Sequence, residues 1–252
     1  MGQGWLGPQD PPAWQSWISI SPDSQLIALS TFEGVATIYR LPGLSVLTNL
    51  FCATMPNPTN DDLEIQVDTN CVPDAGEVAF SPDGRWLALV RRDGRTELRN
   101  VTNHWTIERT MELGGWSLAF TPDSKILGMV SANYLRFFRV SDARLVAAYD
   151  AEPGGVTALA FSPDGRFFAY GRGDGAVVLA RMPVVITNVV RTNAQTALEW
   201  QGGSGPYQVQ QTSNVATGLW EQVGGPTTNT NATVPTTNPT AFFRIRSLTN
   251  AP

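Results

Sequence analysis

The sequence predicts an all-β protein, and three observations lead to this prediction. The chain of 252 residues contains 23 glycines and 18 prolines, a composition typical of short strands joined by turns. A segment with strand-like alternation of apolar and polar residues recurs four times. No helical period of comparable length is present, and hydrophobic residues make up 42% of the chain, which is enough for a core.

The charge balance excludes one class of partner. The chain has 17 basic and 22 acidic residues, for a net charge of -5, and contains no basic run. Nucleic acid is therefore not expected as a partner, because its recognition depends on a basic patch. No window approaches the roughly 18 apolar residues of a membrane span, and the first residues lack the pattern of a signal peptide.

The repeat is defined by its spacing. Its four copies begin at Ser21, Ser81, Thr121 and Ser162, so the starts are 60, 40 and 41 residues apart. In every copy, ten positions separate the Asp of a first turn from a residue of a second turn. The first spacing is longer than the others by about 20 residues, and the extra residues fall in the polar stretch between Cys52 and Cys71. We expect this stretch, about 52–71, to be an insertion in a loop.

Each copy has the pattern of a four-stranded antiparallel meander. The residues one and three positions before the Ser or Thr are apolar, which predicts a strand with one buried face. A Pro-Asp-Gly or Pro-Asp-Ser turn follows, then a second strand, a hairpin such as Asp-Gly, a third strand and a more variable fourth strand. A small residue, one of Ala28, Ala88, Gly128 and Ala169, stands seven positions after each Ser or Thr and suits a close approach of neighbouring sheets.

The copies resemble the blades of WD-repeat β-propellers, within residues 14–182. The resemblance implies a partial or four-bladed β-propeller of four-stranded antiparallel blades, which we place in a domain of residues 1–183. The Trp-Asp pair of that family is absent, and no Gly-His pair precedes the first strand of any copy, so the family's hydrogen-bond network is not carried over. The positions of the Trp-Asp pair hold Tyr39-Arg40, Arg99-Asn100, Phe138-Arg139 and Ala180-Arg181.

The repeats leave open how the propeller closes. The fourth copy ends at Met182-Pro183 without a clear outer strand. Four blades could close on themselves, two chains could pair as a dimer, or additional blades could precede Met1. We favour additional blades, because terminal repeats need caps and the Gly/Pro-rich start has no such character.

From Val184 onward the composition changes. Only five of the last 69 residues are charged, and short alternating runs predict a small β-sandwich over residues 184–252; a disordered Thr-rich tail is the alternative. The order LEWQGGSGPYQVQQ, LWEQV and AFFRIRS resembles a fibronectin-like module of secreted bacterial proteins. That resemblance implies core-packing roles for Trp200, Tyr207, Trp220 and Phe243-Arg244, and an extracellular or cell-surface location.

The two cysteines bracket one loop. Cys52 and Cys71 have no competing partner, which predicts a disulfide in an oxidising compartment, worth about 3 kcal/mol in the chain-entropy model. Two unpaired cysteines are the alternative. No metal site is expected, since two cysteines and the single His104 do not fill a zinc shell without carboxylates.

The search for chemistry finds no catalytic constellation and no cofactor motif. Arg91, Arg92, Arg95 and Arg172 flank two hairpins and are candidates for binding an anionic partner, with solvated loop arginines as the alternative. We therefore predict a non-catalytic scaffold that binds a protein or glycan through propeller loops, within a larger exported protein. The alternative is a fragment of a propeller enzyme, of hydrolase, lactonase or oxidoreductase type, whose active site is completed by missing blades.

Overall fold

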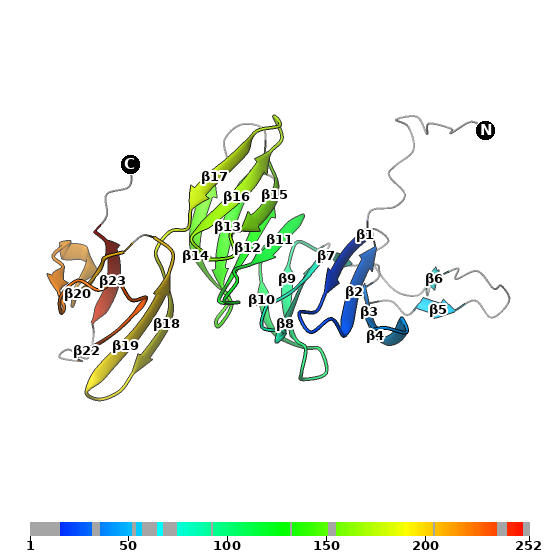
Figure 1. The fold of residues 1–252 in the computed structure, drawn as a ribbon, viewed down its shortest axis with the longest axis horizontal. Helices are drawn as coiled ribbons and strands as arrows, with labels where there is room; N and C mark the ends of the chain where they lie inside the picture. Colours follow the sequence, from blue (N-terminus) through cyan, green and yellow to red (C-terminus); the bar gives the residue numbers. More distant parts are fainter. Residues whose placement is uncertain are drawn as a thin grey trace. The chain divides into compact units, whose positions relative to one another are not determined.

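The fold was analysed in a computed structural model (Figure 1). The residues that the structure describes are 16–31, 36–51, 54–56, 65–67, 75–91, 93–131, 133–150, 155–203, 205–235 and 241–248. The chain divides into two compact units, residues 1–118 and 119–252. Apart from one 3-10 turn, η1 (Val215–Thr217), the regular structure within these residues is β. No helix there is long and apolar enough to cross a membrane.

The first unit contains two four-stranded antiparallel meanders, which correspond to the first two copies of the repeat. The first blade consists of β1 (Ser16–Ile20), β2 (Leu26–Thr31), β3 (Ala36–Arg40) and β4 (Ser45–Phe51). The second blade consists of β7 (Ala75–Phe80), β8 (Trp86–Arg91), β9 (Thr96–Asn100) and β10 (Thr106–Met111). In both blades each strand pairs with the next strand along the chain, as the repeat predicts.

The stretch predicted as a loop insertion contains regular structure. Two short strands, β5 (Thr54–Pro56) and β6 (Ile65–Val67), pair antiparallel as a hairpin of their own. The Pro, Asn and Asp residues of this stretch are typical of turns, and strands of three residues are too short to show an alternating pattern. The hairpin was therefore not predicted. Cys52 and Cys71 both lie outside the described residues, so their predicted disulfide stays a prediction.

The third and fourth blades belong mainly to the second unit. The third blade consists of β11 (Ser117–Phe120), β12 (Ile126–Ser131), β13 (Tyr134–Arg139) and β14 (Arg144–Asp150). The fourth blade has three strands, β15 (Val156–Phe161), β16 (Phe167–Arg172) and β17 (Val177–Arg181). The described part of the chain supplies no fourth strand beside β17, in line with the missing outer strand of the fourth copy.

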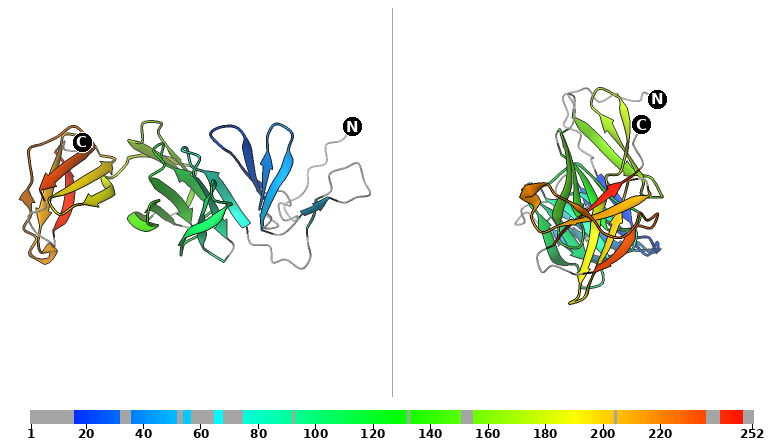
Figure 2. Two further views of the ribbon diagram at one scale, coloured as in Figure 1. Left: turned by 90° about the horizontal axis from the view of Figure 1, so that it is seen from below. Right: turned by 90° about the vertical axis from the view of Figure 1, so that its left-hand side faces the viewer.

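The C-terminal strands form two three-stranded sheets (Figure 2). One contains β18 (Val185–Arg191), β19 (Gln195–Gln201) and β22 (Asn231–Pro235). The other contains β20 (Tyr207–Thr212), β21 (Glu221–Gln222) and β23 (Phe242–Ser247). Both sheets contribute to one core, whose buried members are Leu198, Trp200, Tyr207, Val209 and Val234. The small β-sandwich is thus present, whereas its likeness to fibronectin-like modules stays a prediction.

The first turn of each blade is held by its own side chains. In the second blade the Ser81 hydroxyl donates to Asp83 Oδ1 over 2.6 Å and accepts from the backbone N–H of Trp86 over 2.9 Å. Asp83 Oδ1 also accepts from the N–H of Arg85. The residue after the Asp has a left-handed backbone, which Gly84 adopts without strain at φ 72°. Ser21, Thr121 and Ser162 donate to Asp23, Asp123 and Asp164 in the same way.

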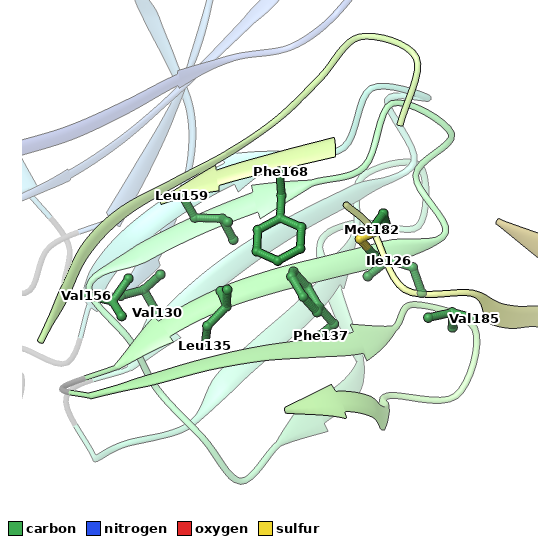
Figure 3. Close-up of a cluster of buried hydrophobic side chains, with 9 residues drawn as sticks. All are labelled: Ile126, Val130, Leu135, Phe137, Val156, Leu159, Phe168, Met182 and Val185. Atoms are coloured by element: carbon green, nitrogen blue, oxygen red, sulfur yellow. The ribbon is translucent and has the colours of Figure 1, made fainter. Parts of the chain in front are cut away.

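The third and fourth blades pack face to face around a shared core (Figure 3). Figure 3 shows Phe137 of β13 and Phe168 of β16 at its centre, where their rings meet edge-on with centroids 5.0 Å apart. Met182 and Val185, on either side of the predicted domain boundary at 183/184, both belong to this core. The boundary itself stays a prediction.

The prediction of a buried face on every first strand is wrong for β1. In the later blades Val78, Phe80, Leu118, Phe120 and Leu159 are buried as expected. Ile18 and Ile20 occupy the same positions in β1 and are exposed. The alternation identifies the apolar face correctly, but within the described residues no blade covers that face in the first copy.

Candidate functional site

Three of the four arginines predicted as a binding group are bonded inside their own hairpins. Arg91, at the end of β8, pairs with Glu97 of β9 over 3.0 Å, and Arg95 donates through Nε to Asp93 over 2.9 Å. In the fourth blade Arg172 pairs with Asp174 over 2.6 Å. Arg92 lies outside the described residues. Each hairpin thus neutralises much of its own positive charge, and the binding role of these four residues stays a prediction.

One buried carboxylate of the second blade, that of Glu97, was not predicted from the sequence. Glu97 is buried in the middle of β9, where it accepts from Arg91 on one side and from Arg99 over 2.7 Å on the other. A buried carboxylate is costly unless it is paired and hydrogen-bonded. The available signal was the position of this charged residue within a predicted strand, between Thr96 and Leu98, which are also buried. This cluster is structural in character.

The second unit contains an open polar cleft of about 870 Å³. Its first wall is formed by the equivalent turns of the third and fourth blades, 122–125 and 163–166. Its second wall comes from the end of β19 and the loop to β20, including Trp200 and Tyr207, and residues 228–231 complete the lining. The cleft therefore joins repeat turns to the C-terminal sandwich, two features that lie far apart in the sequence.

Charges of both signs line this cleft. Lys125 Nζ pairs with Glu199 Oε2 over 2.7 Å, and this hydrogen bond with the lysine charge lowers the pKa of Glu199. The Ser162 hydroxyl, followed by the N–H of Arg166, lowers the pKa of Asp164. Asp123 faces the side-chain amide of Gln201, which donates over 2.9 Å when its nitrogen is oriented toward the carboxylate. The cleft carries ionised groups at neutral pH.

The apolar part of the cleft consists of packed and buried aromatic side chains. Trp200 and Tyr207 pack edge-on with ring centroids 5.7 Å apart, and the Tyr207 hydroxyl donates to the carbonyl of Gly202 over 3.0 Å. Gly202 has φ 77°, and a Cβ there would collide with the carbonyl oxygen of Pro183. The core-packing role predicted for Trp200 and Tyr207 is confirmed by their burial. The backbone between Trp200 and Tyr207 follows this course because Gly202 and Gly203, directly after β19, adopt positive φ angles without a Cβ.

The arrangement is suited to recognition. The cleft offers hydrogen-bond donors and acceptors, a basic and an acidic rim and a fixed aromatic floor. Across the described ranges, no group of three or more His, Cys, Asp or Glu side chains could hold a metal ion. The sequence did not single out this cleft, because its lining comes from four separate segments.

The fold and the repeat define the class of protein: the chain carries WD-repeat-like β-propeller blades. The family model described as WD domain, G-beta repeat matches residues 143–179, which span β14 and most of the fourth blade. Among solved structures, the computationally designed Ika4 protein superposes with a TM-score of 0.50 at 15% identity, covering 73% of this chain and 100% of that one. This likeness concerns the fold alone.

Curated relatives match about three-fifths of the chain at low identity. An uncharacterized WD repeat-containing protein of Synechocystis sp. is 24% identical over 160 residues, which cover 61% of this chain and 40% of the relative. Pre-mRNA-processing factor 19 homolog 2 of Arabidopsis thaliana is 27% identical over 61% of this chain, and Protein HIR1 of Kluyveromyces lactis is 25% identical over 64%. The chain spans only 27% and 21% of the lengths of these last two proteins.

Proposed function

We propose that this chain is a protein-interaction scaffold and that the cleft of the second unit binds its protein ligand. The observation that carries the proposal is the cleft itself, in which equivalent turns of two blades and the C-terminal sandwich contribute side chains to one surface. WD-repeat-like blades favour protein binding over catalysis at this coarse level. The relatives have low identity and cover the chain only in part, so they do not indicate the ligand. We infer the class of ligand from the chemistry of the cleft.

The ligand that fits this chemistry is a polar polypeptide segment with an acidic side chain. Lys125 and Arg166 occupy the same place in successive blades, two residues after the turn Asp, and both line the cleft. Asp123 and Asp164 lie on the same wall, and Glu199 on the facing wall already pairs with Lys125. Arg166 is therefore the cationic group that an acidic side chain of the ligand would contact.

A charge reversal at Arg166 tests the proposal. The full chain is screened against a displayed peptide library, and selected peptides are measured by fluorescence anisotropy. We expect Arg166→Glu to raise the dissociation constants of the selected peptides by roughly tenfold or more, which corresponds to a loss of about 1.4 kcal/mol of binding free energy. Arg144→Glu is the matched control, because Arg144 is exposed at the start of β14 and does not line the cleft.

Two results would contradict this function. One is a library that yields no saturable binder to the folded chain. The other is a set of peptides whose affinity changes equally with Arg166→Glu and Arg144→Glu, since that pattern reports net charge and not the cleft. Raising the salt concentration should weaken the interaction of the wild-type chain, because the pairing groups are exposed to solvent.

We also propose an extracellular or cell-surface location, which rests on sequence features alone. The support is the cysteine pair that brackets residues 53–70 and the resemblance of the C-terminal segment to modules of secreted proteins. The test is to digest intact cells of the source organism with protease and follow the chain by immunoblot. Protection of the chain in intact cells, with digestion only after lysis, would overturn the proposed location.

A further inference from the structure

The first blade exposes an apolar face. Ile18 is 64% exposed and Ile20 56% exposed, although they alternate along β1 as core residues do. In the sheet they stand opposite Leu29 and Ile27 of β2, which are only partly buried. Four apolar side chains therefore share one side of this sheet. Scattered exposed residues need no explanation, but a contiguous patch of this kind marks a contact surface.

The second blade shows what covers such residues. Val78 and Phe80 of β7 stand at the positions of Ile18 and Ile20, opposite Leu89 and Leu87 of β8. They are 4% and 8% exposed because they pack on the first blade in a core with Ala28 and Ile38. The backbone N–H of Phe80 also donates to the Ser19 hydroxyl over 2.9 Å. The first strands of the second and fourth blades thus each pack one face on the preceding blade.

The fourth blade exposes the opposite half of the same interface. Leu179 pairs with Ala169 across β17 and β16, as Ile38 pairs with Ala28 in the first blade. Ile38 is 0% exposed, and so is Phe137, which pairs with Gly128 in the third blade. Leu179 is 70% exposed and Val177, on the same face, 77%. This surface has the apolar residues of a blade face that receives another blade, but no other blade among the described residues lies on it.

We propose that a second copy of this chain supplies the occupant, so that β1 of one copy packs on the β16–β17 face of the other. The two exposed surfaces are the two halves of an interface already seen between the first and second blades and between the third and fourth. A two-fold pair satisfies both halves in both copies, so that neither of these two apolar faces stays exposed.

Oligomeric state and two charge substitutions test this inference. The full chain, kept under reducing conditions so that intermolecular disulfides do not contribute, is measured by light scattering over a wide range of concentration. We expect twice the chain mass of 27.3 kDa. Ile20→Glu and Leu179→Glu should each weaken the dimer by roughly tenfold or more, because each buries a charge in both contacts. Leu219→Glu is the control, since Leu219 is 75% exposed in the C-terminal sandwich.

Mixing the two variants distinguishes this pairing from others. A mixed dimer of Ile20→Glu and Leu179→Glu has one contact with two substitutions and one wild-type contact, so it should form more tightly than either variant alone. Circular dichroism of each variant confirms that the blades are folded. A monomer at every concentration overturns the inference. So does a dimer that neither substitution weakens, or a mixture no tighter than the single variants, since those results indicate self-closure or another interface.

Discussion

Gly128 of the third blade lies directly beneath Leu159 of the fourth. A Cβ placed on Gly128 would collide with the Leu159 Cδ2 atom and would lie 3.0 Å from Phe161 Cζ and 3.2 Å from Phe137 Cε1. In the third blade, the small residue seven positions after the Thr therefore marks the point where the fourth blade lies against it. The close approach of neighbouring sheets that the sequence predicts is confirmed at Gly128.

We predict that Gly128→Val lowers the free energy of unfolding by about 1–3 kcal/mol, because an added side chain overpacks the blade interface. The measurement is urea denaturation followed by tryptophan fluorescence. Gly43→Ala is the matched control, since no atom lies within 4 Å of its added Cβ, and a change of less than about 1 kcal/mol is expected. Equal stability of the Gly128→Val and wild-type chains would contradict this packing.

The turn hydroxyls contribute to stability in each blade. Ser81 is fully buried, and its hydroxyl is both the donor to Asp83 and the acceptor for the Trp86 N–H. Ser81→Ala leaves that N–H without this partner, so we expect a loss of about 1–3 kcal/mol. Ser81→Thr should retain most of the stability, because Thr121 makes the same bonds in the third blade. Thermal unfolding of the two variants compares them; similar melting temperatures would contradict the role of the hydroxyl.

The stability of the fold should depend on pH through Glu77. Burial raises the pKa of Glu77 to about 7, although the carboxyl accepts from the backbone N–H of Leu118. Its Oε2 atom is buried and has no hydrogen-bond partner in the described residues. The folded state therefore binds a proton more tightly than the unfolded state. The protonated carboxyl therefore favours the folded state. This contribution to the free energy of unfolding is fully present below the ordinary pKa of 4.5 and is lost as the pH rises through about 7.

The variant Glu77→Gln removes this dependence. We expect it to exceed the wild-type chain in stability above pH 7, by up to about 3 kcal/mol at full ionisation, and to match it near pH 4.5. Urea midpoints of both chains between these pH values supply the measurement. Carboxylates such as Asp23 and Asp164, whose pKa values are lowered, affect both chains equally at more acidic pH. A difference between the two chains that is constant with pH would contradict the titration of Glu77.

The arginines of the second blade should separate into a structural and an exposed class. Arg91→Ala leaves buried Glu97 with Arg99 as its ion-pair partner, so we expect a loss of about 1–3 kcal/mol. Arg95→Ala removes an exposed pair with Asp93 and should leave the stability nearly unchanged, because solvent screens such pairs. Chemical denaturation of both variants provides the comparison. An equal effect of the two substitutions would show that burial of Glu97 does not distinguish them.

The strands of the blades were predictable because their signals are local. Apolar alternation before Ser81, the Pro-Asp-Gly turn and the Asp93-Gly94 hairpin all act within a few residues, and each appears in the structure where the sequence places it. Burial is not local. Ile18 has the same alternation as Val78, yet only Val78 has a blade packed on it.

The cleft could not be predicted for the same reason. Lys125 and Glu199 are 74 residues apart in the chain, and no pattern in the sequence links the two positions. Their ion pair depends on how the strands after Met182 return toward the blade turns, which is a property of tertiary packing. The arginines at the hairpins drew attention because they cluster in sequence, but the Asp residues beside them, Asp93 and Asp174, already pair with them. Clustering in sequence is a weaker guide to a binding surface than convergence in space.

The predicted disulfide between Cys52 and Cys71 is the remaining test of the cellular compartment. The hairpin β5–β6 lies between the two cysteines and pairs Thr54 with Val67, so it shortens the separation that the crosslink must close. We expect the chain purified from its source without reductant to resist alkylation and to gain two alkyl groups after reduction. Reduction should lower the free energy of unfolding by less than the roughly 3 kcal/mol of an unstructured loop, because the hairpin already restricts the chain. The substitution of both cysteines by serine is the control, since its stability should not respond to reductant. Alkylation of both cysteines without reduction would contradict the disulfide and remove one of the two supports for an exported protein.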